Sequence, residues 1–217
     1  MALAPSEIVC LWEQGVTLEP LARAVLLAAG PEQRDAWDWP LDRRDRALMT
    51  LLGELEGAET VDSVATCASC GEPVALAVPL AALIAADTPL PSSLRAPTSR
   101  DLADALALPD AAARRLLAAR ASRADPDSLD AATVDRIEVA LEGSGAGDIR
   151  LDFACPSCGA VAEASFDPAA LAWRALTAAA DTLLHDIDRL ARTYGWSDTA
   201  ILALAPARRQ RLLELAQ

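Results

Sequence analysis

Apolar residues between positions 1 and 60 recur every three or four residues, which is the spacing of amphipathic helices. We expect three helices there, over residues 6–15, 17–30 and 41–55. Ser6 is the expected N-cap of the first helix, and Gly15 ends it. The charged residues 42–46 begin the third helix and are interpreted as a solvated helix end.

The spacing changes to the alternation of β-strands in two later stretches, residues 61–78 and 148–166. In each stretch, two short strands flank the sequence Cys-x-x-Cys-Gly, at residues 67–71 and 155–159. The glycine favours the left-handed backbone conformation that closes a tight turn. Each stretch is therefore predicted to be a β-hairpin with a cysteine-bearing knuckle at its tip.

The residues between the two hairpins return to helical spacing. We expect a short buried helix over residues 80–85 and three small helices that begin near Thr98, Asp110 and Asp130. The apolar positions of the last of these are Val134, Ile137, Val139 and Leu141. The glycine-rich residues 143–147 are expected to be a flexible exit towards the second hairpin.

A long helix is expected after the second hairpin. Asp167 and Pro168 are a helix-start signal, and apolar residues then recur at helical spacing as far as Gly195. Ser197 and Pro206 begin two further short helices.

Cys67, Cys70, Cys155 and Cys158 are interpreted as the ligands of one structural zinc ion. One Cys-x-x-Cys pair holds a tetrahedral metal from one side, and two such pairs complete the site without an open position. Residues 71–154 separate the pairs, whereas compact zinc ribbons have roughly 15–20 residues there. Closing the longer loop costs about 4 kcal/mol. Because structural zinc contributes about 10–16 kcal/mol, the metal outweighs the loop.

Other interpretations of these cysteines stay open: two disulfides, a redox-active pair, or degenerate knuckles that hold no metal. Two disulfides would leave Cys10 over. A redox-active Cys-x-x-Cys opens a helix, whereas strand-like residues follow both pairs. Cys10 lies in a helical pattern and is expected to be a small buried apolar residue.

The predicted fold class is α+β: mainly α with a small β zinc ribbon. The ribbon is split by an inserted helical subdomain and flanked by N- and C-terminal helices. We expect N-terminal helices over residues 1–60 and C-terminal helices over residues 167–217. Between them lie the first half of the ribbon (61–80), the insert (81–147) and the second half of the ribbon (148–166).

The composition argues against several classes of protein. Hydrophobic residues make up 53% of the chain, enough for a folded core. The net charge of −13 argues against unassisted nucleic-acid binding. The longest apolar run, residues 73–86, is shorter than the roughly 20 residues that span a bilayer. The N-terminus lacks the basic start and apolar core of a secretory signal, so we expect a cytoplasmic protein with no membrane or nucleic-acid partner.

The sequence offers little for catalysis. The sole histidine, His185, falls in a helical pattern beside Asp186 and Asp188, and such a histidine is more often a surface or packing residue than a base. There is no nucleophile elbow and no glycine-rich phosphate loop. We therefore expect neither enzymatic activity nor a small-molecule substrate.

The end of the chain, residues 196–217, is interpreted as a docking element. The residues expected to bind a partner there are Trp196, Arg208, Arg209 and Arg211. Tryptophan and arginine are common interface anchors, and a cationic patch on an acidic chain would orient an acidic partner. The alternative is that the leucines of this segment pack on the preceding helix and the arginines offset its acidic surface.

Several landmarks of the chain occur together, in the same order, in one known family. The end of the chain carries Asp-Arg-Leu-Ala-Arg-Thr-Tyr-Gly-Trp-Ser, Ile-Leu-Ala-Leu and Pro-Ala-Arg-Arg, at residues 188–197, 201–204 and 206–209. Earlier landmarks are the two knuckles and the sequences Leu-Trp-Glu-Gln-Gly at 11–15, Arg-Asp-Arg at 44–46 and Pro-Thr-Ser-Arg-Asp-Leu at 97–102. With this ordered set, the chain resembles the baseplate hub and assembly proteins of contractile-tailed phages and phage-derived contractile injection systems.

The resemblance implies a non-enzymatic baseplate component or assembly factor that binds neighbouring tail proteins and can be incorporated into the particle. The chain has Asp188 where family members often have histidine, so no role of that histidine carries over, and His185 is not its equivalent. It has Ala205 where family members often have serine, so the last helix is expected to lack a side-chain cap. A cytoplasmic zinc-ribbon assembly chaperone absent from the finished particle is the alternative. A zinc-ribbon regulator of nucleic acid would need a basic face.

Overall fold

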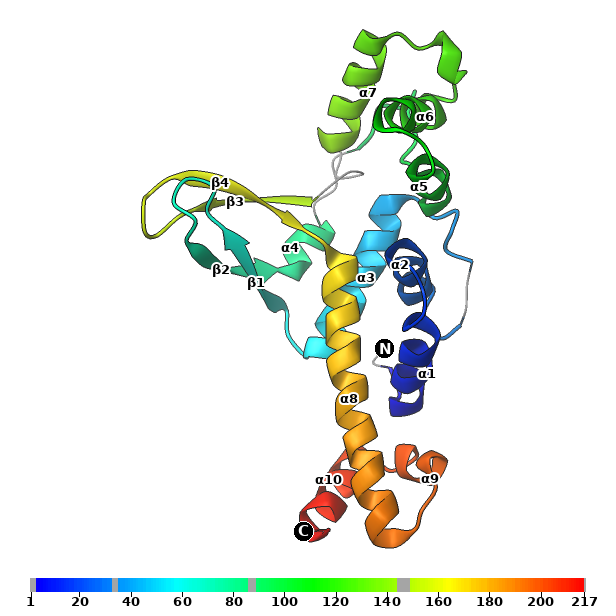
Figure 1. Ribbon diagram of the computed structural model, residues 1–217, viewed down its shortest axis with the longest axis vertical. Helices are drawn as coiled ribbons and strands as arrows, with labels where there is room; N and C mark the ends of the chain where they lie inside the picture. The colour runs from blue at the N-terminus through cyan, green and yellow to red at the C-terminus, as the bar shows by residue number, and fades with distance from the viewer. Residues whose placement is uncertain (1–2, 33–34, 86–88, 144–148, 217) are drawn as a thin grey trace.

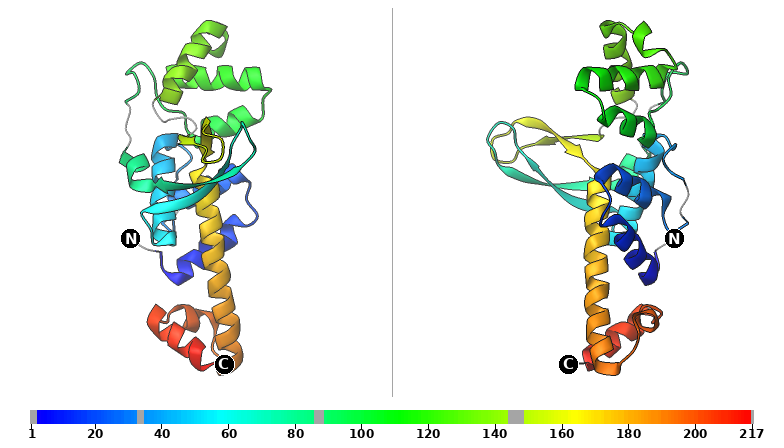
Figure 2. Two further views of the ribbon diagram at one scale, coloured as in Figure 1. Left: turned by 90° about the vertical axis from the view of Figure 1, so that its left-hand side faces the viewer. Right: turned by 45° about the vertical axis from the view of Figure 1, so that its right-hand side comes forward.

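The protein is elongated, and one long helix runs through most of its length. The computed structural model describes residues 3–32, 35–85, 89–143 and 149–216. The long helix, α8 (Pro168–Tyr194), has 27 residues and is therefore about 40 Å long. The N-terminal helices and the hairpins surround its first half, and the C-terminal helices fold back on its second half (Figures 1 and 2).

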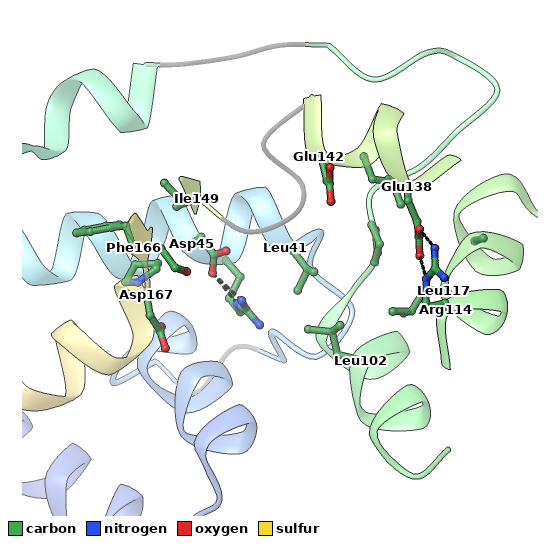
Figure 3. A pocket seen from close by; sticks show the side chains of 16 residues that line it. Leu41, Asp45, Leu102, Arg114, Leu117, Glu138, Glu142, Ile149, Phe166 and Asp167 are labelled. Carbon is green, nitrogen blue, oxygen red and sulfur yellow. Dashed lines mark hydrogen bonds and ion pairs between the residues drawn. The ribbon is translucent and has the colours of Figure 1, made fainter. Parts of the chain in front are cut away.

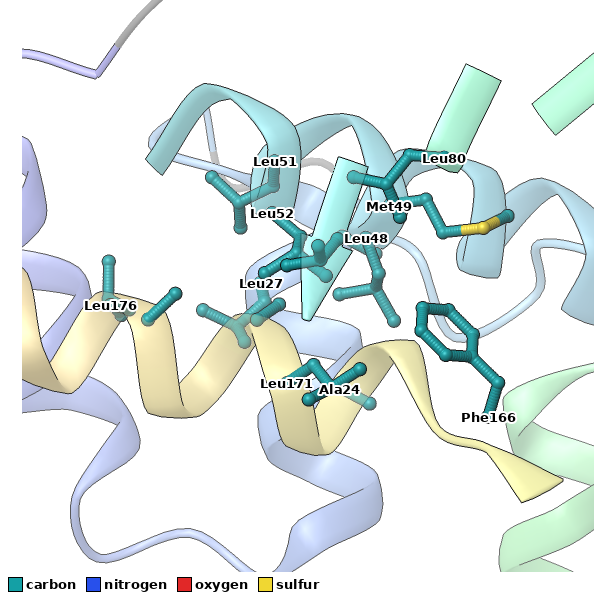
Figure 4. Close-up of a cluster of buried hydrophobic side chains, with 14 of the residues drawn as sticks. Ala24, Leu27, Leu48, Met49, Leu51, Leu52, Leu80, Phe166, Leu171 and Leu176 are labelled. Atoms are coloured by element: carbon teal, nitrogen blue, oxygen red, sulfur yellow. The ribbon is translucent and has the colours of Figure 1, made fainter. Parts of the chain in front are cut away.

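The main core lies between α8 and the three N-terminal helices α1 (Pro5–Gly15), α2 (Pro20–Ala29) and α3 (Leu41–Glu56). Side chains from α2, α3 and α8 meet in it, with Phe166 at one end (Figure 4). Ala172 and Leu176 of α8 and Leu48 of α3 are wholly buried. Small residues such as Ala24 and Ala172 let these helices approach closely.

The starts of the first two helices differ from the prediction. The N-cap of α1 is Ala4, and Ser6 lies inside the helix. The free amide of Ala4 donates instead to the Glu7 carboxylate at 2.7 Å. The second helix begins at Pro20 rather than at residue 17, because proline suits the first helical position, where no amide donor is needed. Both helices end at the predicted glycines.

The charged start of α3 is partly buried, which corrects the interpretation of residues 42–46 as a solvated helix end. Asp45 is only 8% exposed and accepts a hydrogen bond from Arg44 Nε at 2.8 Å. Arg44 also donates to the Ser99 hydroxyl at 3.3 Å. Desolvation raises the pKa of Asp45 even though Arg44 acts in the opposite direction. Residues of the insert and the start of α8 both lie beside this end of the helix.

The two predicted hairpins are present, each as a separate two-stranded antiparallel sheet. The first consists of β1 (Thr60–Thr66) and β2 (Pro73–Pro79), and the second of β3 (Ile149–Ala154) and β4 (Val161–Phe166). At their bases Val61, Val78 and Phe166 join the main core. The following helix α4 (Leu80–Ala85) also contributes Leu80 to that core.

The insert has a small core of its own. It contains α5 (Ser99–Leu106), α6 (Asp110–Ser122), the short 3-10 turn Pro126–Ser128 and α7 (Ala131–Gly143). Thr98 caps α5 as predicted: its hydroxyl accepts from the amide of Asp101, whose carboxylate accepts from the amide of Thr98. Ala121, Ile137 and Leu141 are buried together, whereas Val139, another apolar position of the last helix, is 69% exposed. The predicted exit, residues 143–147, lies outside the described residues except for Gly143 at the end of α7.

The chain ends in two short helices, α9 (Asp198–Leu202) and α10 (Pro206–Leu215), which pack on the second half of α8. Leu190, Ile201 and Leu213 form their shared core. The Ser197 hydroxyl caps α9, whereas α10 has no side-chain cap, as expected from Ala205. Within the described residues, no helix combines the length and the apolar character needed to cross a bilayer.

Candidate metal centre

The two knuckles have the same backbone geometry. In the first, the Cys67 amide donates to the carbonyl of Glu72 at 2.9 Å, and the Gly71 amide donates to the carbonyl of Cys67 at 2.8 Å. In the second knuckle, the amides of Cys155 and Gly159 donate the two equivalent backbone hydrogen bonds, each at 2.9 Å. Gly71 and Gly159 have φ angles of 75° and 73°, values that glycine adopts without steric cost. Each turn therefore directs two cysteine side chains towards the same side.

The structure brings the two knuckles together at the tips of the hairpins. All four Sγ atoms lie within 4.8 Å of one another. Across the hairpins, Cys67 Sγ lies 3.7 Å from Cys158 Sγ, and Cys70 Sγ lies 3.7 Å from Cys155 Sγ. Four sulfurs around a zinc ion with bonds of about 2.3 Å are separated by about 3.8 Å at tetrahedral angles. The two separations across the hairpins therefore match those around a tetrahedral metal ion, and the four cysteines could hold one.

The same distances distinguish the site from a disulfide framework. A disulfide bond is about 2.05 Å long, and all four cysteines are free thiols in the structure. Neither knuckle opens a helix, which is where a redox Cys-x-x-Cys stands; each leads into a strand. The arrangement is that of a cluster of potential ligands.

Each hairpin contributes one buried and one exposed cysteine. Cys67 and Cys155 are 1% and 2% exposed and pack against Val74 and Phe153. Cys70 and Cys158 are exposed. No histidine, aspartate or glutamate of the described residues joins the four cysteines. A zinc ion held by four thiolates has no open position for water, so this donor set suits a structural rather than a catalytic metal.

The thiols influence one another strongly. Hydrogen bonds from the amides of Cys70 and Ser69 lower the pKa of Cys67 to about 6. For Cys70, the amide of Glu72 acts in the same direction, but the Cys158 thiol, burial and the two other thiols outweigh it and raise its pKa to about 12. The metal-free cluster therefore does not ionise all its thiols together at neutral pH. A bound metal ion would deprotonate all four.

The predicted docking residues lie about the C-terminal helices, but they do not form one free patch. Arg209 Nε lies 3.2 Å from Asp186 Oδ2, and its side chain is 12% exposed. Trp196 stacks on Tyr194, with ring centroids 4.9 Å apart. Arg208 is exposed and has no ion-pair partner among the described residues. Arg211 is also exposed, and its Nη1 lies 2.7 Å from Glu214 Oε2.

Cys10 and His185 both lie on exposed faces of helices. Cys10, predicted to be buried, is exposed and accepts a hydrogen bond from Gln14 at 3.0 Å, because it lies on the outer face of α1. His185 is exposed, and its Nδ1 lies 2.7 Å from the carbonyl oxygen of Asp181 in the same helix.

Comparisons of the chain with protein-family models, curated protein sequences and solved structures find no match.

Proposed function

We propose that the four cysteines bind one zinc ion, which makes the two hairpins the halves of a split zinc ribbon. The observation that carries this proposal is the meeting of four sulfurs from positions 85 and 91 residues apart in sequence. The hairpins form separate sheets, and the apolar cluster at their tips is small. A zinc ion bound with a free energy of about 10–16 kcal/mol would be the main link between these tips.

Metal analysis tests the zinc site directly. Protein purified under reducing conditions should hold close to one equivalent of zinc. Cys155→Ser should lose the metal and several kcal/mol of unfolding free energy, because a buried ligand is removed. Cys10→Ser is the matched control, since it removes an exposed thiol outside the cluster and should change neither quantity. A folded wild-type protein without metal, or one with a Cys67–Cys70 disulfide, would contradict the proposal.

The role proposed for the whole protein is a non-enzymatic part of the baseplate of a contractile phage tail or injection system. The family resemblance, including the knuckles and the C-terminal motif, supports it. The shape supports it as well, because the hairpin tips, the insert and the C-terminal helices extend from the central core and offer separate surfaces to neighbouring tail proteins (Figure 1).

Mass spectrometry of purified particles distinguishes a baseplate component from an assembly chaperone. A component remains in the finished particle, whereas a chaperone is found only in lysates with unassembled tail proteins. Arg208→Glu combined with Arg211→Glu should reduce co-purification with tail proteins while zinc content stays unchanged. This variant is preferable to deleting α10, because the deletion would remove Leu213 from the C-terminal core. Absence of the chain from both particles and assembly intermediates would overturn the proposed role.

A further inference from the structure

A cavity of about 440 Å³ lies where the insert meets the central core. It is bounded by α3, by α5 to α7 and by the start of α8 (Figure 3). Leu102, Leu117, Ile149 and Phe166 give it an apolar lining. Its volume is within the range of about 300–1,000 Å³ that is typical of binding pockets.

The charges around this cavity are unbalanced. Arg44 is paired with Asp45, and Arg114 is paired with Glu138 at 2.7 Å (Figure 3). Two further carboxylates in the lining, Glu142 and Asp167, have no cation partner among the described residues. Asp167 accepts hydrogen bonds from the amides of Ala169 and Ala170, which do not neutralise its charge. The cavity thus combines an apolar lining with an excess of negative charge.

The opposite combination occurs on the last helix. Arg208, Arg211 and Leu215 of α10 are spaced at i, i+3 and i+7, so they form one stripe along the helix. All three are exposed, and Leu215 is 60% exposed. The opposite side of α10 is already used, since Leu213 is buried against α8 and α9. The stripe therefore offers Arg208, which has no ion-pair partner among the described residues, and one apolar side chain to something outside the C-terminal core. Arg211 joins them by exchanging its solvent-exposed ion pair with Glu214 for a carboxylate of the partner.

We propose that the α10 stripe of one copy docks in the insert cavity of a second copy of this chain. The two guanidinium groups would compensate Glu142 and Asp167, and Leu215 would contact the apolar lining. The cavity lies beside the start of α8, whereas α10 packs near the other end of this helix (Figures 1 and 2), so one chain cannot make this contact with itself. The contact joins two different surfaces, so it generates a ring or an open chain, or a twofold dimer when two copies exchange it reciprocally.

This inference builds on the proposed docking role of α10, and it names the acidic partner as another copy. One helix stripe in one cavity buries less surface than a stable interface of about 1,200–2,000 Å². The association should therefore be weak at micromolar concentrations and should weaken further with added salt, because both unpaired carboxylates are exposed.

Sedimentation velocity of the full-length protein over a concentration series tests the proposal. The wild type should associate reversibly, with an average mass that rises with concentration. Arg208→Glu/Arg211→Glu and, separately, Glu142→Arg should each weaken self-association by about tenfold or more. Glu13→Arg is the matched control, because Glu13 is exposed on α1 and undergoes the same change of charge. Zinc content and circular dichroism report whether each variant is folded.

Mixing the two variants gives the decisive result. The arginine variant keeps an intact cavity, and Glu142→Arg keeps an intact stripe, so a head-to-tail contact should return in the mixture. A wild type that stays monomeric throughout, or a mixture that does not associate, would overturn the inference. If the wild type is monomeric but the arginine variant still loses tail proteins, the proposed function stands and only the self-association fails. If the chain self-associates but binds no tail protein, the self-association stands and the proposed function fails.

Discussion

Gly15 at the end of α1 lies directly against the indole ring of Trp173 in α8. A Cβ atom placed on Gly15 would lie 2.5 Å from Cζ3 of that ring. Arg23 holds the arrangement from the other side: its guanidinium lies 4.3 Å from the centroid of the Trp173 ring, and its Nε donates to the Gly15 carbonyl at 3.2 Å. The glycine thus permits the close approach of α1 to α8.

We predict that Gly15→Ala destabilises the protein. The ring has to move or α1 has to shift, and overpacking of this kind costs about 1–3 kcal/mol. Chemical denaturation measures the change in unfolding free energy. If helix propensity dominated instead, the substitution would stabilise the protein by about 0.5–1 kcal/mol, which is the outcome that contradicts the packing argument. Gly15→Ala combined with Trp173→Leu should recover part of the loss.

The second prediction concerns the knuckle glycines. Gly159→Ala places a side chain at a φ of 73°, with nothing within 4 Å of the added Cβ, so the cost is backbone strain of about 1–2 kcal/mol. Because this strain lies in the turn that directs Cys155 and Cys158, zinc affinity in a chelator competition should fall by about tenfold. Gly57→Ala is the control: its φ is 62°, its added Cβ also meets nothing, and it lies outside the site. Equal zinc affinity in both variants would contradict the prediction.

Local signals in the sequence predicted much of this fold, and contacts between distant segments account for the rest. Thr98, Asp167 and Ser197 cap helices where the sequence places them, because a cap needs only residues two or three positions away. The sequence does not predict the burial of Asp45, because the segments that lie beside it, around Ser99 and Asp167, are distant in sequence. The sequence favours Ser6 as a cap, but the Glu7 carboxylate accepts from the Ala4 amide and the helix begins one residue earlier, at Pro5.

The candidate metal site shows the same division. The repeated Cys-x-x-Cys-Gly is visible in the sequence, and it gave the four residues that the structure brings together. Which cysteine is buried, and which sulfur faces which across the two hairpins, depends on how the separate sheets pack. The cavity beside the insert could not be predicted, because its lining comes from segments as far apart as Leu41 and Pro168.

The third prediction concerns Asp186 and Arg209. Their ion pair is largely shielded, with side chains 19% and 12% exposed, and Arg209 Nη1 has no hydrogen-bond partner in the structure. Asp186→Ala should therefore cost about 1–3 kcal/mol, because it leaves a poorly solvated guanidinium without its carboxylate. Thermal unfolding measures the loss. Asp188→Ala is the control, since that residue forms an exposed pair with Arg192 on the same helix and should change stability by less than about 0.5 kcal/mol.

The fourth prediction is a pH dependence at Asp101. Burial acts to raise its pKa, but Arg95 and the amide of Thr98 outweigh burial and hold the pKa below the ordinary value of 3.8. The unfolded chain takes up the proton first as the pH falls, so the contribution of Asp101 to stability is complete above about pH 4 and is lost below it.

Stability of the wild type and of Asp101→Asn should be compared from pH 6 down to pH 3. The difference between them should shrink at the acid end of this range, because protonation abolishes the charge that the variant already lacks. Asp38→Asn is the control, since Asp38 is exposed and its bond to Arg100 is screened by solvent. A difference for Asp101→Asn that stays constant with pH would contradict the assignment.

The long separation of the two cysteine pairs has a consequence for synthesis of the chain. Cys70 leaves the ribosome 85 residues before Cys155. At about 5–20 residues per second, the first knuckle waits roughly 4–17 s for the second. During that interval the thiols of the first knuckle have no partner knuckle. They can react with oxidants or bind metals that prefer two ligands. Capture of zinc by all four cysteines would then be a late event, one that occurs only on chains whose insert has already emerged.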